Sequence, residues 1–293
     1  MKQLHTYQIM LAAPTRKLLD GNSMPSVACG VFRLSPGKET YDSVLSALKL
    51  GYRHVDTAAL YGNEESVGKA IRDSGVPREE IFVTTKLNTF MQVFDYAGTL
   101  KAIQQQHALL NVGCIDCYLI HAPRANRLDQ WRALMEAQKA GLVKTIGVSD
   151  YSIKELLEIE DANLPIPTVL QIELNPFLAD VRKAEVEYAQ KKGIVCVCWG
   201  AMAKNGKDDD KAVTAVAARY GRSVPDVLLK WSQELGFVTL TTSCNPKHQQ
   251  SNLEIVADPS WTLSSEDMEA LKVCAATPFH SIRGGDLSGA KGR

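Results

Sequence analysis

The 293-residue sequence has no excess of either charge, because 33 Lys and Arg residues balance 33 Asp and Glu residues. A protein that binds nucleic acid or an anionic membrane surface usually carries a basic excess, so the composition supports neither partner. No apolar run approaches the roughly 20 residues that span a bilayer. The apolar stretch at residues 9–13 is too short for the core of a signal peptide. We therefore expect a cytoplasmic protein.

The seven cysteines form no pattern typical of cross-links, because their number is odd and they are scattered along a long chain. Cys114 and Cys117 form a C-x-x-C pair, but no second pair stands at the spacing of a zinc site. Cys196 and Cys198 alternate in a strand-like run and so face the same side of it. We expect buried, reduced thiols and no bound metal.

Strand-like and helix-like segments alternate along the chain, which predicts parallel strands joined by right-handed crossovers. The expected strands are residues 26–32, 54–58, 81–87, 114–122, 145–150, 169–175, 194–200 and 237–243. The expected helices are residues 40–50, 64–74, 96–110, 128–140, 153–160, 183–192 and 226–235. An open doubly wound sheet is the alternative, but no G-x-G-x-x-G motif follows the first strand. We predict a single domain, residues 1–293, folded as a (β/α)8 barrel.

Short signals mark the ends of these elements. The pair Asp20-Gly21 predicts the turn of a β-hairpin that precedes the barrel and closes its bottom. Glycines in the left-handed conformation are expected to end five helices, at Gly51, Gly75, Gly141, Gly193 and Gly236. The tail after Cys274 is rich in Gly, Ser and basic residues and is predicted to be a loop.

Four polar residues stand near the carboxyl ends of three consecutive predicted strands. Asp56 lies near the end of the second strand and Tyr61 in the loop after it, while Lys86 and His121 lie near the ends of the third and fourth. These ends share one face of a parallel barrel, the face on which such barrels carry their active sites. We therefore predict that the four side chains form one site.

These residue types suit the polarisation and protonation of a carbonyl group. A tyrosine has an ordinary pKa of about 10, and a buried ammonium such as that of Lys86 would favour its phenolate. Asp56 would keep Lys86 charged, and His121 could donate a hydrogen bond to a substrate carbonyl. Such a set needs a separate source of hydride. Alternatively, the Asp–Lys pair is structural and the histidine is a satisfied core residue.

Four sequence blocks carry a resemblance to a known family. They are HVDTA at residues 54–58, LYGNE at 60–64, TTKL at 84–87 and LIH at 119–121. In order and spacing they resemble the signature blocks of the aldo-keto reductases, and the similarity runs over residues 17–271. The chain looks nearest to the 2,5-diketo-gluconate reductase and prostaglandin F synthase type. The resemblance implies NAD(P)H-dependent carbonyl reduction with Tyr61 as proton donor, and a C-terminal loop folded over the active site.

The same resemblance implies a cofactor site in the second half of the chain. The implied contacts are Ser149, Asp150, Gln171, Trp199, Ser243, His248 and Asn252. Asp150 replaces the family's usual Asn, so it can accept but not donate a hydrogen bond. Thr242 and His248 stand where two cations usually hold the 2′-phosphate of NADPH. We expect NADPH to be used, with a reduced advantage over NADH.

The substrate site also departs from the family pattern. Phe32 is an expected lining residue, whereas Asn88 and Ala122 stand where the family commonly has Trp. Fewer large rings leave more room, so we expect a bulky small-molecule carbonyl substrate. We also expect a monomer or weak homo-oligomer.

Two other functions stay open from the sequence. One is a redox-neutral acid–base enzyme, such as an isomerase, lyase or cyclase, on the same scaffold, and the altered phosphate contacts keep it open. The other is a non-catalytic binding protein of the same fold. The complete set of four polar residues speaks against this second alternative.

Overall fold

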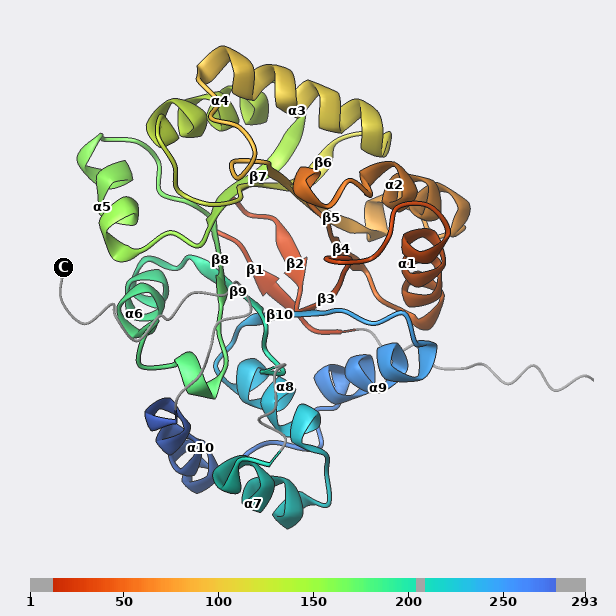
Figure 1. The fold of residues 1–293 in the computed structure, drawn as a ribbon, viewed down its shortest axis with the longest axis vertical. Helices are drawn as coiled ribbons and strands as arrows, with labels where there is room; N and C mark the ends of the chain where they lie inside the picture. The colour runs from red at the N-terminus through yellow and green to blue at the C-terminus, as the bar shows by residue number, and fades with distance from the viewer. Residues whose placement is uncertain (1–12, 204–208, 278–293) are drawn as a thin grey trace, which may run out of the picture.

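The computed structural model describes residues 13–203 and 209–277, and it has the predicted closed barrel of eight parallel strands (Figure 1). Each strand pairs with the next in chain order, and the last pairs with the first. The strands are β3 (Val27–Gly30), β4 (His54–Asp56), β5 (Phe82–Leu87), β6 (Ile115–Ile120), β7 (Val143–Ser149), β8 (Val169–Glu173), β9 (Val195–Trp199) and β10 (Val238–Thr241). The open-sheet alternative is thereby excluded.

Helices surround the barrel, because each crossover between parallel strands returns along its outside (Figure 1). They are α1 (Lys38–Leu50), α2 (Glu64–Asp73), α3 (Tyr96–Leu110), α4 (Arg127–Lys139), α5 (Ile153–Asp161), α6 (Lys183–Lys192), α7 (Lys211–Tyr220), α8 (Val224–Glu234), α9 (Pro246–Ala257) and α10 (Ser265–Ala270). As predicted, Gly51 and Gly193 end α1 and α6 in the left-handed conformation, with φ of 113° and 75°.

Three helices, α7, α9 and α10, were missing from the predicted set. Each begins at a capping side chain that accepts a hydrogen bond from a backbone amide of the first turn: Asp210, Asn245 and Ser264, respectively. Capping of this kind satisfies amides that have no partner within the helix. These capping residues are therefore local signals that could have located the starts of the three helices.

The predicted hairpin closes the amino-terminal end of the barrel. It consists of β1 (Thr15–Lys17) and β2 (Ser23–Pro25), paired antiparallel. Leu18 and Met24 pack into a buried cluster with residues of the barrel strands. The side chain of Thr145, near the start of β7, donates a 2.6 Å hydrogen bond to Asp20 Oδ2 and so fastens the turn to the barrel. The hairpin does not cover the opposite end of the barrel, where the strands have their carboxyl ends and where the site is predicted.

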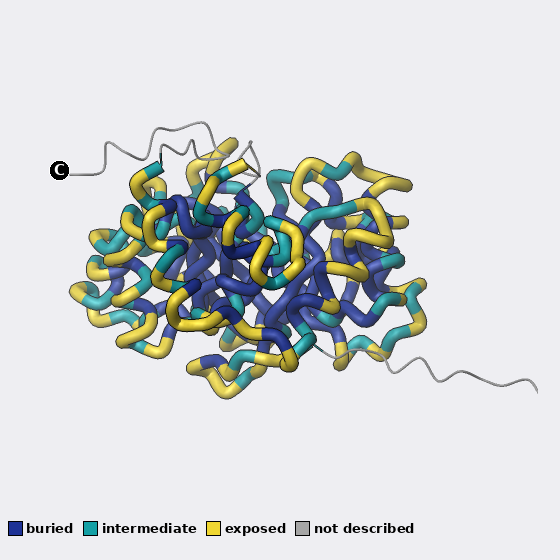
Figure 2. Tube along the Cα trace, turned by 90° about the horizontal axis from the view of Figure 1, so that it is seen from below, coloured by how far each residue is buried: buried dark blue, intermediate teal, exposed yellow. Residues whose placement is uncertain are grey.

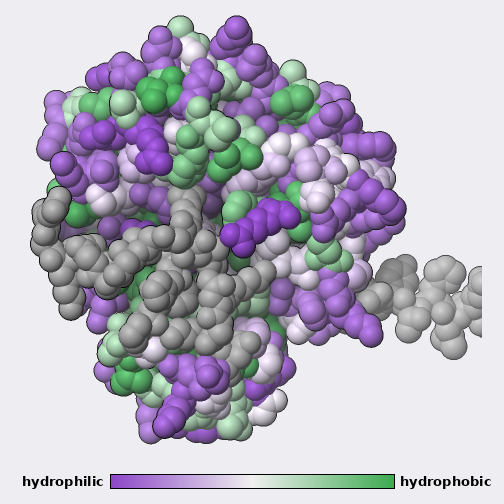
Figure 3. Space-filling model, in the orientation of Figure 1, coloured by the Kyte–Doolittle hydropathy of each residue, from purple (hydrophilic) through white to green (hydrophobic). Residues whose placement is uncertain are grey.

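Figure 2 shows the buried residues gathered through the middle of the molecule and the exposed ones outermost. In Figure 3, hydrophilic residues cover most of the visible described surface, with hydrophobic residues in separate patches. Among the described residues, no helix is both long and apolar enough to cross a membrane. Five of the seven cysteines are buried, while Cys114 is half-buried and Cys244 exposed. The predicted C-terminal loop over the site lies outside the described residues.

Candidate active site

A cavity of about 580 Å³ opens at the carboxyl ends of the strands. Residues from both halves of the chain line it. They include Gly30, Phe32, Asp56, Tyr61, Phe90, His121, Gln171, Trp199, Met202, Thr242 and Ser243. The four residues predicted to form one site are therefore near one another, because Asp56, Tyr61 and His121 reach this cavity and Lys86 binds Asp56 from beneath it.

A second cavity, of about 630 Å³, lies at the opposite end beside the hairpin. Four of its charged side chains form two ion pairs: Arg53 pairs with Glu80 at 3.2 Å, and Lys144 pairs with Asp116 at 2.7 Å. It lies at the amino-terminal ends of the strands, away from the predicted site. The cavity at the carboxyl ends is therefore the candidate active site.

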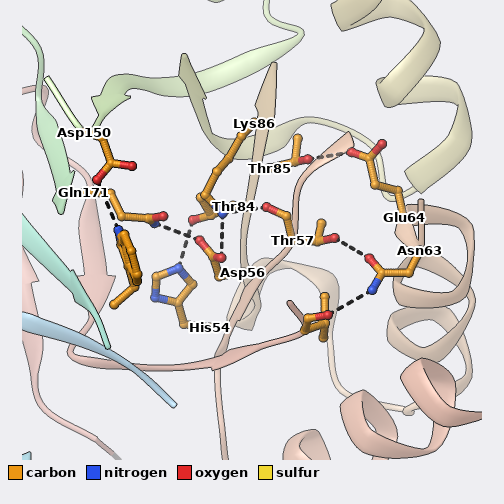
Figure 4. Close-up of polar contacts among 12 residues, drawn as sticks. His54, Asp56, Thr57, Asn63, Glu64, Thr84, Thr85, Lys86, Asp150 and Gln171 are labelled. Carbon is orange, nitrogen blue, oxygen red and sulfur yellow. Dashed lines mark hydrogen bonds and ion pairs between the residues drawn. The ribbon is translucent and has the colours of Figure 1, made fainter. Parts of the chain in front are cut away.

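A buried ion pair forms the base of the site (Figure 4). Lys86 Nζ lies 2.6 Å from Asp56 Oδ1 and donates a second hydrogen bond, of 2.7 Å, to the carbonyl oxygen of Thr57. The side chains of Lys86 and Asp56 are only 0% and 3% exposed. Burial lowers the pKa of Lys86, but the negative charge of Asp56 and the nearby Tyr61 raise it, and the net pKa is above its usual value. Lys86 is thus held as an ammonium ion.

Tyr61 lies directly against this ammonium. Its ring centroid is 5.3 Å from Lys86 Nζ, and it ends the 3₁₀ turn η1 (Ala59–Tyr61) that follows β4. The ring of His121 meets the Tyr61 ring edge-on at 5.7 Å. The phenol and the imidazole therefore lie side by side on the cavity wall, with the ammonium behind the phenol.

Gln171 makes a contact that the sequence did not indicate. Its Nε2 donates a 3.0 Å hydrogen bond to Asp56 Oδ2, the oxygen not used by Lys86 (Figure 4). The two residues are 115 positions apart, on β8 and β4, so only closure of the barrel brings them together. Both carboxylate oxygens of Asp56 are consequently satisfied by donors.

Buried polar residues from the LYGNE block hold the loops of the site. Asn63 accepts a 2.8 Å hydrogen bond from Thr57 Oγ1 and donates to the carbonyl oxygen of Val31 at 3.0 Å (Figure 4). Glu64 accepts hydrogen bonds from Thr85 Oγ1 at 2.5 Å and from Gln106 Nε2 at 2.9 Å.

The Gln106 amide also donates to the carbonyl oxygen of Lys86 at 3.1 Å, so this network fixes the backbone that carries the ammonium. Burial raises the pKa of Glu64. Sequence reasoning gave neither Asn63 nor Glu64 a role, although both stand in a block that carried the family resemblance.

The residues expected to hold a nicotinamide gather at the ends of β7, β8 and β9. Ser149 is fully buried, and its hydroxyl has no hydrogen-bond partner among the described residues. Asp150 has a left-handed backbone with φ of 54°, and its Oδ1 accepts a hydrogen bond from Trp199 Nε1 at 3.4 Å. A buried hydroxyl without a partner is the kind of group that a ligand amide would satisfy. This region therefore fits the carboxamide of a nicotinamide.

The residues expected at the adenosine end are more widely spread. Thr242 and Ser243 line the cavity, and the carbonyl oxygen of Ser243 accepts a 2.8 Å hydrogen bond from Gln249 Nε2. His248 is exposed on α9, whereas Asn252 is only 9% exposed. Neither is among the described residues that line the cavity. The loop before α9 therefore presents the hydroxyl groups of Thr242 and Ser243 to the cavity, in a region where the family resemblance implies cationic side chains.

The expected substrate residues are only partly placed at the cavity. Phe32 lines it and lies 5.1 Å from Tyr61, but Asn88 and Ala122 are not among the described residues of its lining. The Thr89 hydroxyl donates to the carbonyl oxygen of Ala122 at 3.0 Å, which ties the two loops together. Phe90 then reaches the cavity, 5.1 Å from His121. A phenyl ring thus occupies space that the sequence had suggested was open.

Comparison with known proteins agrees with this geometry. The family model described as aldo/keto reductase matches residues 33–276. The chain is 39% identical over 264 residues to an aldo-keto reductase of Mycobacterium sp. (strain MCS), covering 88% of this chain and 89% of the relative. It is 37% identical over 259 residues to the glyoxal reductase of Bacillus subtilis (strain 168), covering 88% and 91%.

Among solved structures, the Bombyx mori aldo-keto reductase in complex with NADP superposes with a TM-score of 0.81 at 30% identity, covering 89% of this chain and 92% of that one. The matches span nearly the whole barrel, including all four signature blocks. The chain belongs to the aldo/keto reductase family, whose members are NAD(P)H-dependent oxidoreductases.

Proposed function

We propose that this protein reduces the aldehyde or ketone group of a small molecule with NADPH, and that Tyr61 delivers the proton. The observation that carries the proposal is the buried Lys86–Asp56 pair, placed behind a phenol and an imidazole that share one cavity wall. The glyoxal reductase activity named for the Bacillus subtilis relative supports a carbonyl substrate. NADP in the Bombyx mori structure supports the cofactor.

The four residues have separable tasks in this reaction. The imidazole of His121 donates a hydrogen bond to the carbonyl oxygen and orients it in the cavity. Tyr61 gives its phenolic proton to the same oxygen as negative charge develops there. Lys86 makes this transfer easier, because a neighbouring ammonium stabilises the phenolate that remains. Asp56 keeps the ammonium charged and fixed, with Gln171 on its second oxygen.

A bound nicotinamide would supply the hydride, which adds to the carbonyl carbon while the proton adds to the oxygen to give an alcohol. Ser149, Asp150 and Gln171 would hold the carboxamide, and Trp199 would cover the ring. Thr242 and Ser243 would face the phosphate end, with His248 and Asn252 further out on α9. Because this end offers hydroxyls in place of cations, we expect NADPH to keep only part of its usual advantage over NADH.

The test combines binding and turnover. Titration of the protein with NADPH and with NADH, followed by cofactor fluorescence, measures each Kd. Loss of NADPH absorbance on adding a panel of small and bulky aldehydes and ketones then measures reduction. Saturable binding with reduction of at least one carbonyl is expected. Failure of both dinucleotides to bind would refute the proposal and favour redox-neutral acid–base chemistry at Tyr61.

A further inference from the structure

Two arginines lie against phenyl rings of the cavity wall. The guanidinium carbon of Arg33 is 5.2 Å from the centroid of the Phe32 ring, and that of Arg124 is 5.0 Å from the centroid of the Phe90 ring. Both phenyl rings line the cavity, whereas both arginines are exposed, so the two pairs lie at its mouth. At these distances a guanidinium is attracted to the face of a ring, which restricts the positions of the long side chain.

Each of the two phenyl rings also contacts a residue that acts on the carbonyl group in the proposed reaction. The Phe32 ring lies 5.1 Å from the Tyr61 ring, and the Phe90 ring lies 5.1 Å from the His121 ring. Each guanidinium therefore lies one ring beyond a residue that meets the carbonyl oxygen. A substrate whose carbonyl group reaches Tyr61 and His121 brings its outer end toward the two arginines.

The loops that carry Phe90 and Arg124 are joined by two hydrogen bonds. Thr89 Oγ1 donates to the carbonyl oxygen of Ala122 at 3.0 Å, and the backbone amide of Ala122 donates to Thr89 Oγ1 at 3.1 Å. Both Thr89 and Ala122 are buried, so water does not compete for these bonds. The position of Arg124 over the Phe90 ring is therefore supported by the packing of the two loops beneath it.

No ion pair neutralises either arginine among residues 13–203 and 209–277. Arg124 donates one hydrogen bond, of 3.1 Å, to the carbonyl oxygen of its neighbour Pro123. Asp56 is the only acidic residue in the described lining of the cavity, and Lys86 balances its charge. A guanidinium presents five N–H donors in a plane, a geometry that suits a carboxylate. The mouth of the cavity is therefore suited to an anionic group.

We propose that Arg33 and Arg124 bind an anionic group of the substrate, and that the preferred substrates are aldehydes or ketones that also carry a carboxylate. The inference rests on the proposed function, because it concerns the substrate of the same reaction. Since each guanidinium lies one ring beyond Tyr61 or His121, the carboxylate and the carbonyl group should be separated by about the length of a phenyl ring.

The aldehydes 4-carboxybenzaldehyde and methyl 4-formylbenzoate test this proposal. Both place a phenyl ring between the aldehyde and the second group, but only the first is an anion. Their kcat/KM values are measured with saturating NADPH, and the readout is the ratio of acid to ester. The double variant Arg33→Gln, Arg124→Gln should lower this ratio by about tenfold or more, because charge-assisted hydrogen bonds are lost. Higher ionic strength should lower the wild-type ratio, because exposed charges are screened.

The double variant Arg132→Gln, Lys183→Gln is the matched control, because it also removes two exposed cations. Arg132 pairs with Asp129 at 3.0 Å and Lys183 pairs with Glu187 at 3.9 Å, each within its own helix. Neither cation is among the described residues that line the cavity. The acid-to-ester ratio should therefore stay at its wild-type value. An equal fall in both double variants would show a dependence on net charge alone and would overturn the inference.

The outcomes separate the inference from the proposed function. A lower ratio in Arg33→Gln, Arg124→Gln alone would support the inference. An unchanged ratio with the ester still reduced would overturn it and leave the reductase proposal intact. If that variant also binds NADPH more weakly in a fluorescence titration, the arginines bind the phosphates of the cofactor instead. Wild type that binds NADPH but reduces neither aldehyde would likewise overturn the inference, and wild type that binds no dinucleotide would refute the proposed function itself.

Discussion

Lys86→Met tests the buried ion pair on which the proposed chemistry depends. The substitution removes the ammonium that lies 2.6 Å from Asp56 Oδ1 and 2.7 Å from the Thr57 carbonyl oxygen. The side chains of the pair are 0% and 3% exposed, so water cannot take the place of the lost partner. Removing one member of a buried pair costs about 3–5 kcal/mol. Such a loss is a large part of the roughly 5–15 kcal/mol that stabilises a folded protein.

Urea denaturation followed by tryptophan fluorescence measures this cost. The matched comparison is the double variant Asp56→Asn, Lys86→Met, which has no buried charge left unpaired and should recover most of the lost stability. Gln171 can still donate to the carbonyl oxygen of the new Asn. A loss below about 1 kcal/mol in Lys86→Met, the range of an exposed ion pair, would refute the description of the pair as desolvated. The same description would be refuted if the double variant Asp56→Asn, Lys86→Met were less stable than Lys86→Met alone.

Tyr61→Phe should keep the fold and cofactor binding but lower kcat for a reactive aldehyde by about 100-fold or more, and a near wild-type kcat would reject its role as proton donor. Burial lowers the pKa of His54 from 6.5 to about 4. As the pH falls, the histidine is therefore protonated in the unfolded chain before it is protonated in the folded protein, which favours unfolding. The free energy of unfolding should fall by about 3 kcal/mol as the pH falls from about 6.5 to about 4. Urea titrations across this range measure the loss, which His54→Gln should largely abolish. Thr242→Lys with His248→Arg should raise the kcat/KM ratio of NADPH to NADH by about tenfold or more; no gain would mean that another cation holds the 2′-phosphate.

The barrel could be predicted because its signals are local and repeated. Each strand is a short apolar run followed by a helix, and residues such as Asp56, Lys86 and His121 could be placed on one face from their position at strand ends alone. Helix α9 shows where prediction from such local signals fails. Asn245 caps its start, but the buried face of its body includes the polar side chains of Gln249 and Asn252, so no continuous apolar stripe indicates its length.

Contacts between distant parts of the chain could not be predicted in the same way. The hydrogen bond from Gln171 to Asp56 depends on the register of strands on opposite sides of the closed barrel, which no local pattern specifies. The path of the loop after β5 is likewise not periodic. It turns Phe90 toward His121 and leaves Asn88 outside the cavity lining, so residue type alone misjudged which side chain would fill the space.

The hairpin at the amino-terminal end of the barrel has a consequence for protein engineering. Its anchoring contacts, from Leu18, Met24 and Asp20 to the barrel, lie at the end opposite the cavity. Substitutions there act on the robustness of the scaffold, whereas substitutions in the loops after the strands act on what the scaffold recognises. A library that varies only the loops can therefore be screened in a background whose hairpin has first been reinforced. The stability added at the hairpin then allows more destabilising loop substitutions to fold, so a wider range of substrate preferences can be screened.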